Sequence, residues 1–116
     1  MLNLFKVVGV SLMVLSGGTT SCYSQGQMHT GADLLNFCEG NDSAMGVCFG
    51  YIMAIADSAF CGYPVLGYSY KPPSRVNYIQ IQKVVVKWLT DHPQNQHELS
   101  SVLVAKALQE TWPCAE

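Results

Sequence analysis

Residues 38–61 read CEGNDSAMGVCFGYIMAIADSAFC, and three of the five cysteines of this 116-residue chain lie in this stretch. Gly40 is expected to end the short apolar segment of residues 34–38, because glycine is favoured just after the last turn of a helix. Residues 41–43, Asn-Asp-Ser, then offer side-chain oxygens that can cap the first N–H groups of a new helix. The mostly apolar residues that follow predict a helix over about residues 44–59.

One helix is expected before this stretch and another after it. Thr30 and Asp33 have the spacing of a capping pair, with a carboxylate in the first turn, and they precede an apolar face. Further along, apolar residues at helical spacing predict a helix over residues 76–90, although three consecutive valines alone would favour a strand. Pro93 is expected to end this helix.

The fourth predicted helix covers about residues 96–111. Asn95 and Glu98 resemble a capping box at its start. Its apolar residues cover more than one face, so we expect the helix to be substantially buried. The four segments predict an all-α fold, a small bundle of about four helices stapled by disulfides.

Four cysteines lie near the predicted helix ends, and four cysteines permit three pairings. In an up-and-down bundle, the end of the first helix meets the start of the second at one pole, and the ends of the second and fourth helices meet at the other. This topology favours the pairs Cys38–Cys48 and Cys61–Cys114. In the chain-entropy description the shorter closed loop is worth about 3 kcal/mol and the longer one about 4 kcal/mol.

Residues 1–24 are predicted to be a cleaved signal peptide. Lys6 precedes an apolar run over residues 7–15, and small polar residues follow. The run is shorter than the roughly 20 residues that span a bilayer as a helix. Cleavage after residue 24 leaves a mature domain of residues 25–116, whereas cleavage three residues earlier would leave Cys22 first, as in a lipoprotein. Membrane attachment is expected only if Cys22 is lipidated.

The composition argues against several functions. Six Lys and Arg against eight Asp and Glu give a net charge of −2, and the cations are scattered, which argues against a nucleic-acid partner. The chain has no Cys-x-x-Cys pair and no tight Cys–His spacing, so neither a redox pair nor a zinc site is expected. No nucleophile–base arrangement stands out. We therefore predict no catalytic residue, no metal, no cofactor and no enzymatic activity.

Small residues recur at every fourth position of the central helix, at Gly46, Gly50, Ala54 and Ser58. Such a stripe lies on one helix face and lets a second backbone approach closely. The favoured occupant is another helix of the same chain, because a small domain must first build its own core. The alternative is a second copy of the chain.

An ordered set of short motifs runs through the mature chain, and together they resemble the Rap/Tai family of type VI secretion immunity proteins over about residues 30–115. No single motif is diagnostic, but their order is fairly specific. The motifs are Leu34-Leu35-x-x-Cys38, Cys48-Phe49-Gly50-Tyr51-Ile52 with Asp57 and Cys61, the run from Ile81 to Leu89, His92-Pro93, Leu103-Val104-x-x-Ala107-Leu108 and Trp112-Pro113-Cys114.

The resemblance implies a small, all-helical, periplasmic protein that acts by binding. It implies a cognate partner, a peptidoglycan amidase effector delivered by neighbouring cells, whose cleft is plugged by a loop of the immunity protein. It also implies a homodimer. A plug of this kind needs shape and hydrogen bonds but no chemistry of its own, and it protects the producing cell.

The chain departs from the family pattern after Cys61, where the link to the next helix is longer and rich in tyrosine. We expect this loop to belong to the binding surface, because Tyr and Arg are enriched at binding hot spots; its tyrosines could equally cap the bundle pole. The polar link at residues 91–97 is the second candidate, with a plain helix–helix turn as its alternative. The predicted partner-binding residues are Tyr63, Tyr68, Tyr70, Lys71, Arg75, Asp91, His92, Gln94, Asn95 and Gln96.

A small periplasmic chaperone of the acid-stress kind is the alternative function. Such proteins are also helical and disulfide-linked, and they would be expected to expose apolar surface on acidification. Dye binding at low pH distinguishes the two functions.

Overall fold

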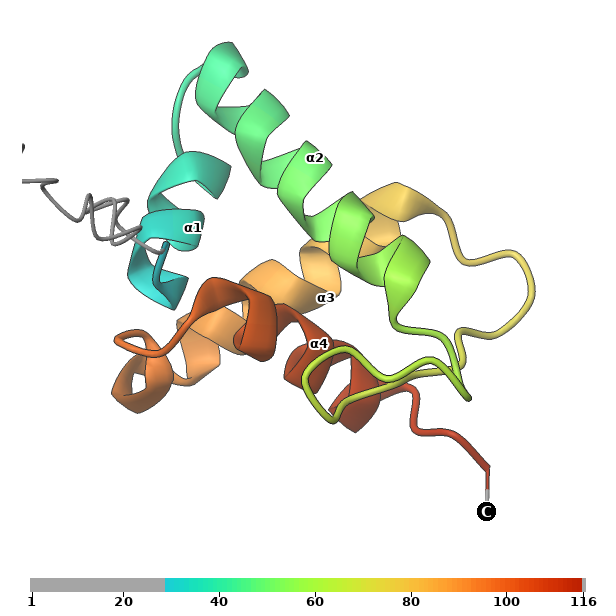
Figure 1. Ribbon diagram of the computed structural model, residues 1–116. Coiled ribbons are helices and arrows are strands. Elements are labelled where there is room, and N and C mark those ends of the chain that lie inside the picture. The colour runs from blue at the N-terminus through green and yellow to red at the C-terminus, as the bar shows by residue number, and fades with distance from the viewer. Residues whose placement is uncertain (1–28, 116) are drawn as a thin grey trace, which may run out of the picture.

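A computed structural model describes residues 29–115, so the predicted signal peptide and Cys22 lie outside the described residues. Within residues 29–115 the chain forms four α-helices and a short 3₁₀ helix, and no strand (Figure 1). The all-α prediction is therefore confirmed. The elements are α1 (Gly31–Cys38), α2 (Asp42–Ser58), α3 (Tyr78–Asp91), η1 (Pro93–Asn95) and α4 (Ser100–Thr111).

Three of the four α-helices begin at a side-chain cap. Thr30 and Asp33 form the predicted capping box of α1, and hydrogen bonds from the Thr30 backbone and hydroxyl hold the pKa of Asp33 below its usual value. Asn41 caps α2, as predicted. A second capping box, formed by Asn77 and Gln80, starts α3. These caps fix where the chain turns into each helix.

The fourth helix begins at Ser100, later than the sequence predicts. Residues 96–99 are instead paired with the start of α1, where the carbonyls of Gln96 and Glu98 accept the first two N–H groups of that helix at 2.9 and 3.0 Å. A helix cannot satisfy these N–H groups itself, so the contact stabilises both segments. The predicted cap of α4 is therefore wrong, because the Asn95 side chain donates to Glu98 in the turn before the helix.

A single apolar core joins the four helices. At Gly31 the backbone of α1 comes close to side chains of α4 and α3. A Cβ at this position would be 2.5 Å from Leu103 Cδ1 and 3.1 Å from Leu89 Cδ2. The first turn of α1 thus packs directly on α4 and α3. The largest fully buried side chains come from every helix and from the loop after α2, and they are Leu34, Ile52, Tyr70, Val85, Leu89, Leu103, Val104 and Leu108.

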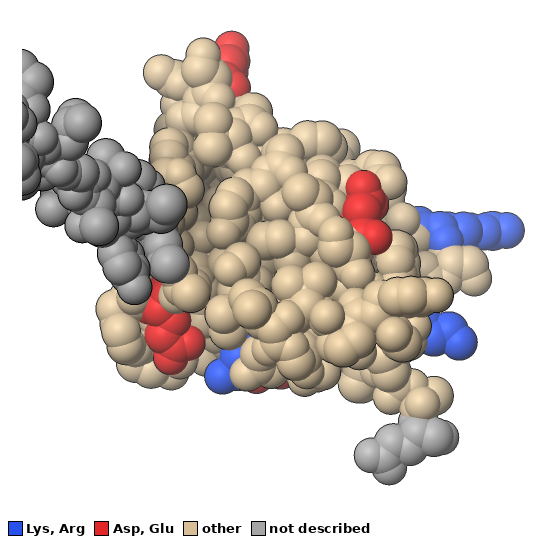
Figure 2. Space-filling view, viewed as in Figure 1, with Lys and Arg blue, Asp and Glu red and all other residues tan. Residues whose placement is uncertain are grey.

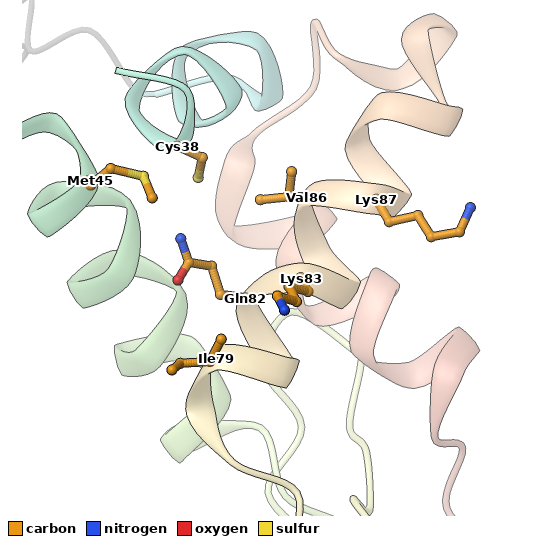
Figure 3. A pocket seen from close by; sticks show the side chains of 7 residues that line it. All are labelled: Cys38, Met45, Ile79, Gln82, Lys83, Val86 and Lys87. Atoms are coloured by element: carbon orange, nitrogen blue, oxygen red, sulfur yellow. The ribbon is translucent and has the colours of Figure 1, made fainter. Parts of the chain in front are cut away.

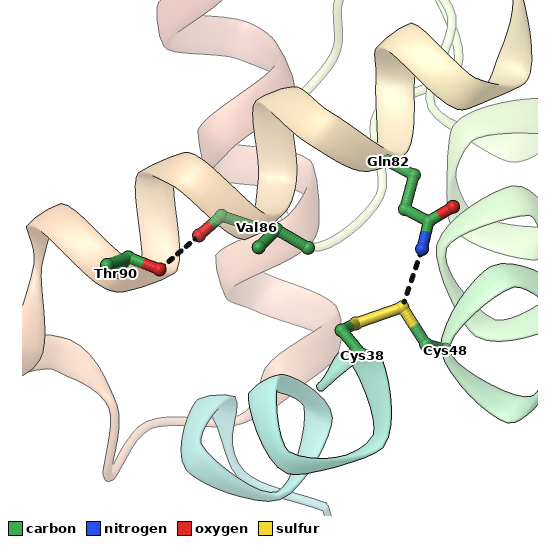
Figure 4. Close-up of a disulfide and its surroundings, with 5 residues drawn as sticks. All are labelled: Cys38, Cys48, Gln82, Val86 and Thr90. Atoms are coloured by element: carbon green, nitrogen blue, oxygen red, sulfur yellow. Dashed lines mark hydrogen bonds between the residues drawn. A yellow bond between two sulfur atoms is a disulfide. The ribbon is translucent and has the colours of Figure 1, made fainter. Parts of the chain in front are cut away.

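Both disulfides pair as predicted. Cys38–Cys48 joins the end of α1 to α2 with a Cα–Cα distance of 5.0 Å, and Cys61–Cys114 joins the loop after α2 to the C-terminal segment at 5.9 Å. The first disulfide faces α3, where the amide of Gln82 donates to Cys48 Sγ at 3.4 Å (Figure 4). Each disulfide therefore ties together segments that the bundle already brings close.

The small-residue stripe of α2 faces away from the core, so the favoured prediction of a helix of the same chain packed on it is wrong. Gly46, Gly50, Ala54 and Ser58 are all exposed, and no atom lies within 4 Å of a Cβ built on either glycine. The core side of α2 is formed instead by Cys48, Ile52 and Ala56.

These placements predict opposite effects for the same substitution at different glycines. Gly46→Ala and Gly50→Ala should each raise the free energy of unfolding by about 0.5–1 kcal/mol, because alanine loses less backbone entropy in a helix and meets no neighbour here. Gly31→Ala should lower it by about 1–3 kcal/mol through overpacking against Leu103. Urea unfolding of dilute protein measures all three. Destabilisation by the α2 substitutions would contradict the exposed position of the stripe.

Candidate functional site

The two segments predicted to bind a partner lie at opposite ends of α3 (Figure 1). The loop of residues 59–77, called the tyrosine loop below, leads into the first residue of α3. The α3–α4 link, residues 91–99, begins at its last residue. An α-helix of 14 residues is about 21 Å long, so the structure does not bring the two segments together into one site.

Polar side chains of the α3–α4 link are engaged within the chain. The His92 ring stacks on Trp88 with centroids 4.0 Å apart, and its Nδ1 lies 2.7 Å from the Trp88 carbonyl oxygen. Gln96 Nε2 donates to the carbonyl of Leu89 at 2.9 Å, which satisfies one of the last carbonyls of α3. Both side chains therefore help to end the helix.

Two further side chains of this link also have internal partners. Asp91 pairs with Lys87 one turn earlier, on the exposed side of α3, and such surface pairs contribute little to stability. Asn95 donates to Glu98 at 3.0 Å, whereas Gln94 is exposed. Taken together, these contacts favour the interpretation of the link as a helix–helix turn.

The tyrosine loop is folded around a tight turn. The backbones of Val65 and Tyr68 exchange two hydrogen bonds, of 2.8 and 3.0 Å, around Leu66 and Gly67. Both central residues have positive φ, +52° and +89°, which is the signature of a type I′ turn. The loop therefore has a defined tip at residues 65–68.

The base of the tyrosine loop is fastened to the rest of the bundle. The Cys61–Cys114 disulfide ties its first segment to the C-terminal segment. Its second segment is held from both sides, because the N–H of Tyr70 donates to the Ala59 carbonyl at 2.8 Å and the N–H of Lys71 donates to the Trp112 carbonyl at 2.9 Å. The loop is thus pre-ordered in the free protein.

The three tyrosines predicted to bind a partner have different environments. Tyr63 is 76% exposed and Tyr68 is half-buried, but Tyr70 is only 1% exposed. The Tyr70 hydroxyl donates to the Ala56 carbonyl at 2.9 Å, and burial, with the charge of Asp57, raises the pKa of Tyr70 to about 12. Tyr70 therefore belongs to the core, which favours the alternative that it caps the bundle pole over a contact with a partner.

The exposed part of the tyrosine loop is apolar and cationic. Phe60 and Leu66, which the sequence analysis missed, are 44% and 59% exposed beside Tyr63. Lys71 and Arg75 are exposed as well, and residues 59–77 contain no Asp or Glu. Cationic side chains project from the edge of the molecule on which this loop lies, while most of the visible face is uncharged (Figures 1 and 2). A leucine before glycine in a proline-rich loop is the sequence signal that could have identified the tip.

A hollow of about 400 Å³ lies between α2 and α3, beside the Cys38–Cys48 disulfide. Its lining contains no carboxylate and no imidazole, and among residues 29–115 no group of three or more Cys, His, Asp or Glu side chains could hold a metal ion. Met45 and Gln82 face each other across the hollow, whereas the Lys87 side chain points away (Figure 3). The lining residues are Cys38, Met45, Ile79, Gln82, Lys83, Val86 and Lys87.

Among residues 29–115, no helix has both the length and the apolar character that crossing a membrane requires.

Comparisons with known proteins agree with the resemblance seen in the motifs. No curated protein matches the chain. The sequence model of the family described as Rap1a immunity proteins matches residues 30–114, which include all four helices and both disulfides. Because this match covers most of the chain, the protein belongs to the Rap1a immunity protein family.

Proposed function

We propose that the protein binds and inhibits a peptidoglycan amidase effector that neighbouring cells deliver by type VI secretion, and that it thereby protects its producer. The family match over residues 30–114 carries the proposal, because an immunity protein acts on a cognate effector. It also favours this function over the acid-stress chaperone. Inhibition of this kind requires binding alone, so no enzymatic activity is proposed.

The proposed site of action is the periplasm, where the wall substrate of such an effector lies. Two disulfides within residues 29–115 support an oxidising compartment, since thiols in the cytosol are kept reduced. Export would depend on the proposed signal peptide at residues 1–24, with residues 25–116 as the mature domain. A lipid anchor at Cys22 would keep the same domain at the membrane surface.

The tyrosine loop is the proposed contact surface. Its exposed residues include Tyr63, Lys71 and Arg75, and its base is held by a disulfide and by backbone hydrogen bonds. A loop that is already ordered loses little conformational freedom on binding, which favours affinity. The α3–α4 link is a weaker candidate, because the side chains of His92, Asn95 and Gln96 already have partners within the chain.

Co-purification tests the function. The mature chain, tagged and isolated from the periplasm with the products of its neighbouring genes, should retain one that cleaves the wall. A Tyr63→Ala/Arg75→Ala variant should retain less of it, and a Gln94→Ala variant, altered in the α3–α4 link, should retain the wild-type amount. Failure to retain any wall-cleaving neighbour, combined with dye binding on acidification, would favour the chaperone instead.

A homodimer is part of the proposal, with the exposed face of α2 as its interface. The small residues on this face would let a second α2 approach closely, and large apolar side chains flank them. Exposed apolar side chains beside a stripe of small residues favour burial against a second copy. Between residues 45 and 54 the exposed face carries no charge, and its residues are Met45, Gly46, Val47, Phe49, Gly50 and Ala54.

Gly50→Leu should convert this dimer into a folded monomer. Gly50 is exposed and no atom lies within 4 Å of a Cβ built on it, so the fold should be kept, but a leucine side chain there would hold the second helix away. Sedimentation equilibrium measures the change, and Thr90→Leu, at an exposed position of α3, is the control that should leave the dimer intact. A wild-type chain that remains monomeric at high concentration, or a Gly50→Leu variant that still dimerises, would remove α2 as the interface.

A further inference from the structure

Two residues other than glycine have a positive φ among residues 29–115, and both lie in the tyrosine loop. They are Leu66, at +52°, and Arg75, at +74°. Side chains with a Cβ are disfavoured in this left-handed region, and residues held there concentrate at functional sites. Because both residues lie in one loop, each side chain needs a reason that offsets the strain of its backbone.

Leu66 occupies the first central position of the type I′ turn. Asn, Asp and Gly are strongly preferred at this position, and leucine has no polar atom with which to compensate for the strained backbone. Burial does not compensate either, because 59% of the Leu66 surface is exposed. For the stability of the folded chain alone, asparagine or glycine would therefore be more favourable at position 66.

Arg75 occupies the second central position of a later turn in the same loop. The N–H of Val76 reaches the Pro73 carbonyl at 3.4 Å, which makes Arg75 the third residue of a four-residue turn, where a positive φ favours glycine. Its side chain is exposed, and the ion pair described within residues 29–115 is Lys87–Asp91, so no carboxylate of that part of the chain pairs with it. Neither packing nor charge pairing accounts for arginine here.

We propose that Leu66 and Arg75 are the recognition pair of the tyrosine loop, Leu66 as an apolar anchor and Arg75 as a cation that meets a carboxylate. This inference rests on the proposed function, and it names the chemistry of the partner: an effector cleft with an apolar pocket and an acidic rim. The charge of the loop favours an acidic partner surface, since residues 59–77 carry Lys71 and Arg75 and no acidic residue.

The anchor is also held in place before binding. The two hydrogen bonds between Val65 and Tyr68 fix the turn on which Leu66 projects, and the Cys61–Cys114 disulfide holds its base. An exposed apolar side chain on a rigid tip suits insertion into a pocket, because little freedom remains to be lost.

Leu66→Asn and Arg75→Gly test the pair, because each removes the side chain and relieves the backbone. Each should raise the melting temperature by about 4 °C, the shift that corresponds to relief of a strained turn in a domain of this size. Each should also weaken binding to the effector by about 10-fold or more, as expected for a hot-spot residue. Calorimetry of unfolding and of binding to the purified effector measures both quantities on the mature chain.

Ile79→Ala is the matched control, because Ile79 is 58% exposed but lies on α3 outside the loop. Its affinity for the effector should stay at the wild-type value. If the wild-type chain does not bind a wall-cleaving effector, the proposed function fails. If the wild type binds and Leu66→Asn and Arg75→Gly bind equally well, only the recognition pair fails. A melting temperature lowered together with affinity would make the two residues structural and would also overturn the pair.

Discussion

Replacing Cys61 and Cys114 together by alanine should lower the free energy of unfolding by about 4 kcal/mol, which is the larger of the losses expected for the two disulfides. The two cysteines are 53 residues apart, so the disulfide closes a long loop and restricts the unfolded chain strongly. Cys38 and Cys48 are only 10 residues apart, and their removal should lower it by about 3 kcal/mol. Urea unfolding of the two double variants measures the difference.

The same pair of variants separates stability from binding. The Cys61–Cys114 disulfide holds the base of the tyrosine loop, whereas Cys38–Cys48 joins α1 to α2 away from it. At a temperature where both double variants remain folded, only the Cys61→Ala/Cys114→Ala variant should bind the effector more weakly. An equal loss of affinity in both would contradict the view that the disulfide pre-orders the loop.

Tyr70→Ala should lower the free energy of unfolding by about 3–5 kcal/mol, in the range of large aromatic-to-alanine substitutions in cores. The Tyr70 ring is buried and stacks on Phe60 at 5.5 Å, and its hydroxyl supplies a donor to the Ala56 carbonyl in the last turn of α2. Tyr63→Ala, at the most exposed tyrosine of the same loop, should change the free energy by no more than about 0.5 kcal/mol.

Thermal and urea unfolding of these two variants, each with the wild type, provide the measurement. Tyr70→Phe adds a finer step, because it keeps the ring and leaves the Ala56 carbonyl without its donor, and it should cost about 1–3 kcal/mol. Similar stabilities for Tyr63→Ala and Tyr70→Ala would mean that the loop does not pack as described.

Local features of the fold were predictable because their signals are local. The side chains of Thr30 and Asn41 stand next to the N–H groups that they cap, and the helical spacing of apolar residues identifies α3 despite its three valines. The disulfide pairing followed from the order of the helices, because an up-and-down arrangement permits little else for Cys61 and Cys114.

Features that depend on distant contacts were not predictable. The start of α4 is displaced because residues 96–99 pair with the first turn of α1, some 65 positions earlier in the chain. The spacing of Gly46 and Gly50 identifies a helix face but not what covers it, and that face proved to be exposed. Composition likewise gave Tyr63 and Tyr70 the same role, although only the fold decides which side chain turns inward.

Within the candidate site, the residue types were predictable and their environments were not. Tyrosine, lysine and arginine marked the loop after α2, but the exposed Leu66 at its tip depends on a type I′ turn whose first central position lacks the usual Asn, Asp or Gly. The polar residues of the α3–α4 link looked equally suited to binding. Their hydrogen bonds to the end of α3 give them a structural role that a sequence pattern does not reveal.

Inhibition of wall hydrolysis tests the proposed function most directly. Purified peptidoglycan is digested by a wall-cleaving effector that co-purifies with this protein, with increasing amounts of the mature chain added. Release of wall fragments should stop when the chain and the effector are equimolar, and Leu66→Asn should require a larger amount for the same effect. Undiminished hydrolysis in the presence of a large excess of folded wild-type protein would contradict an immunity function against that effector.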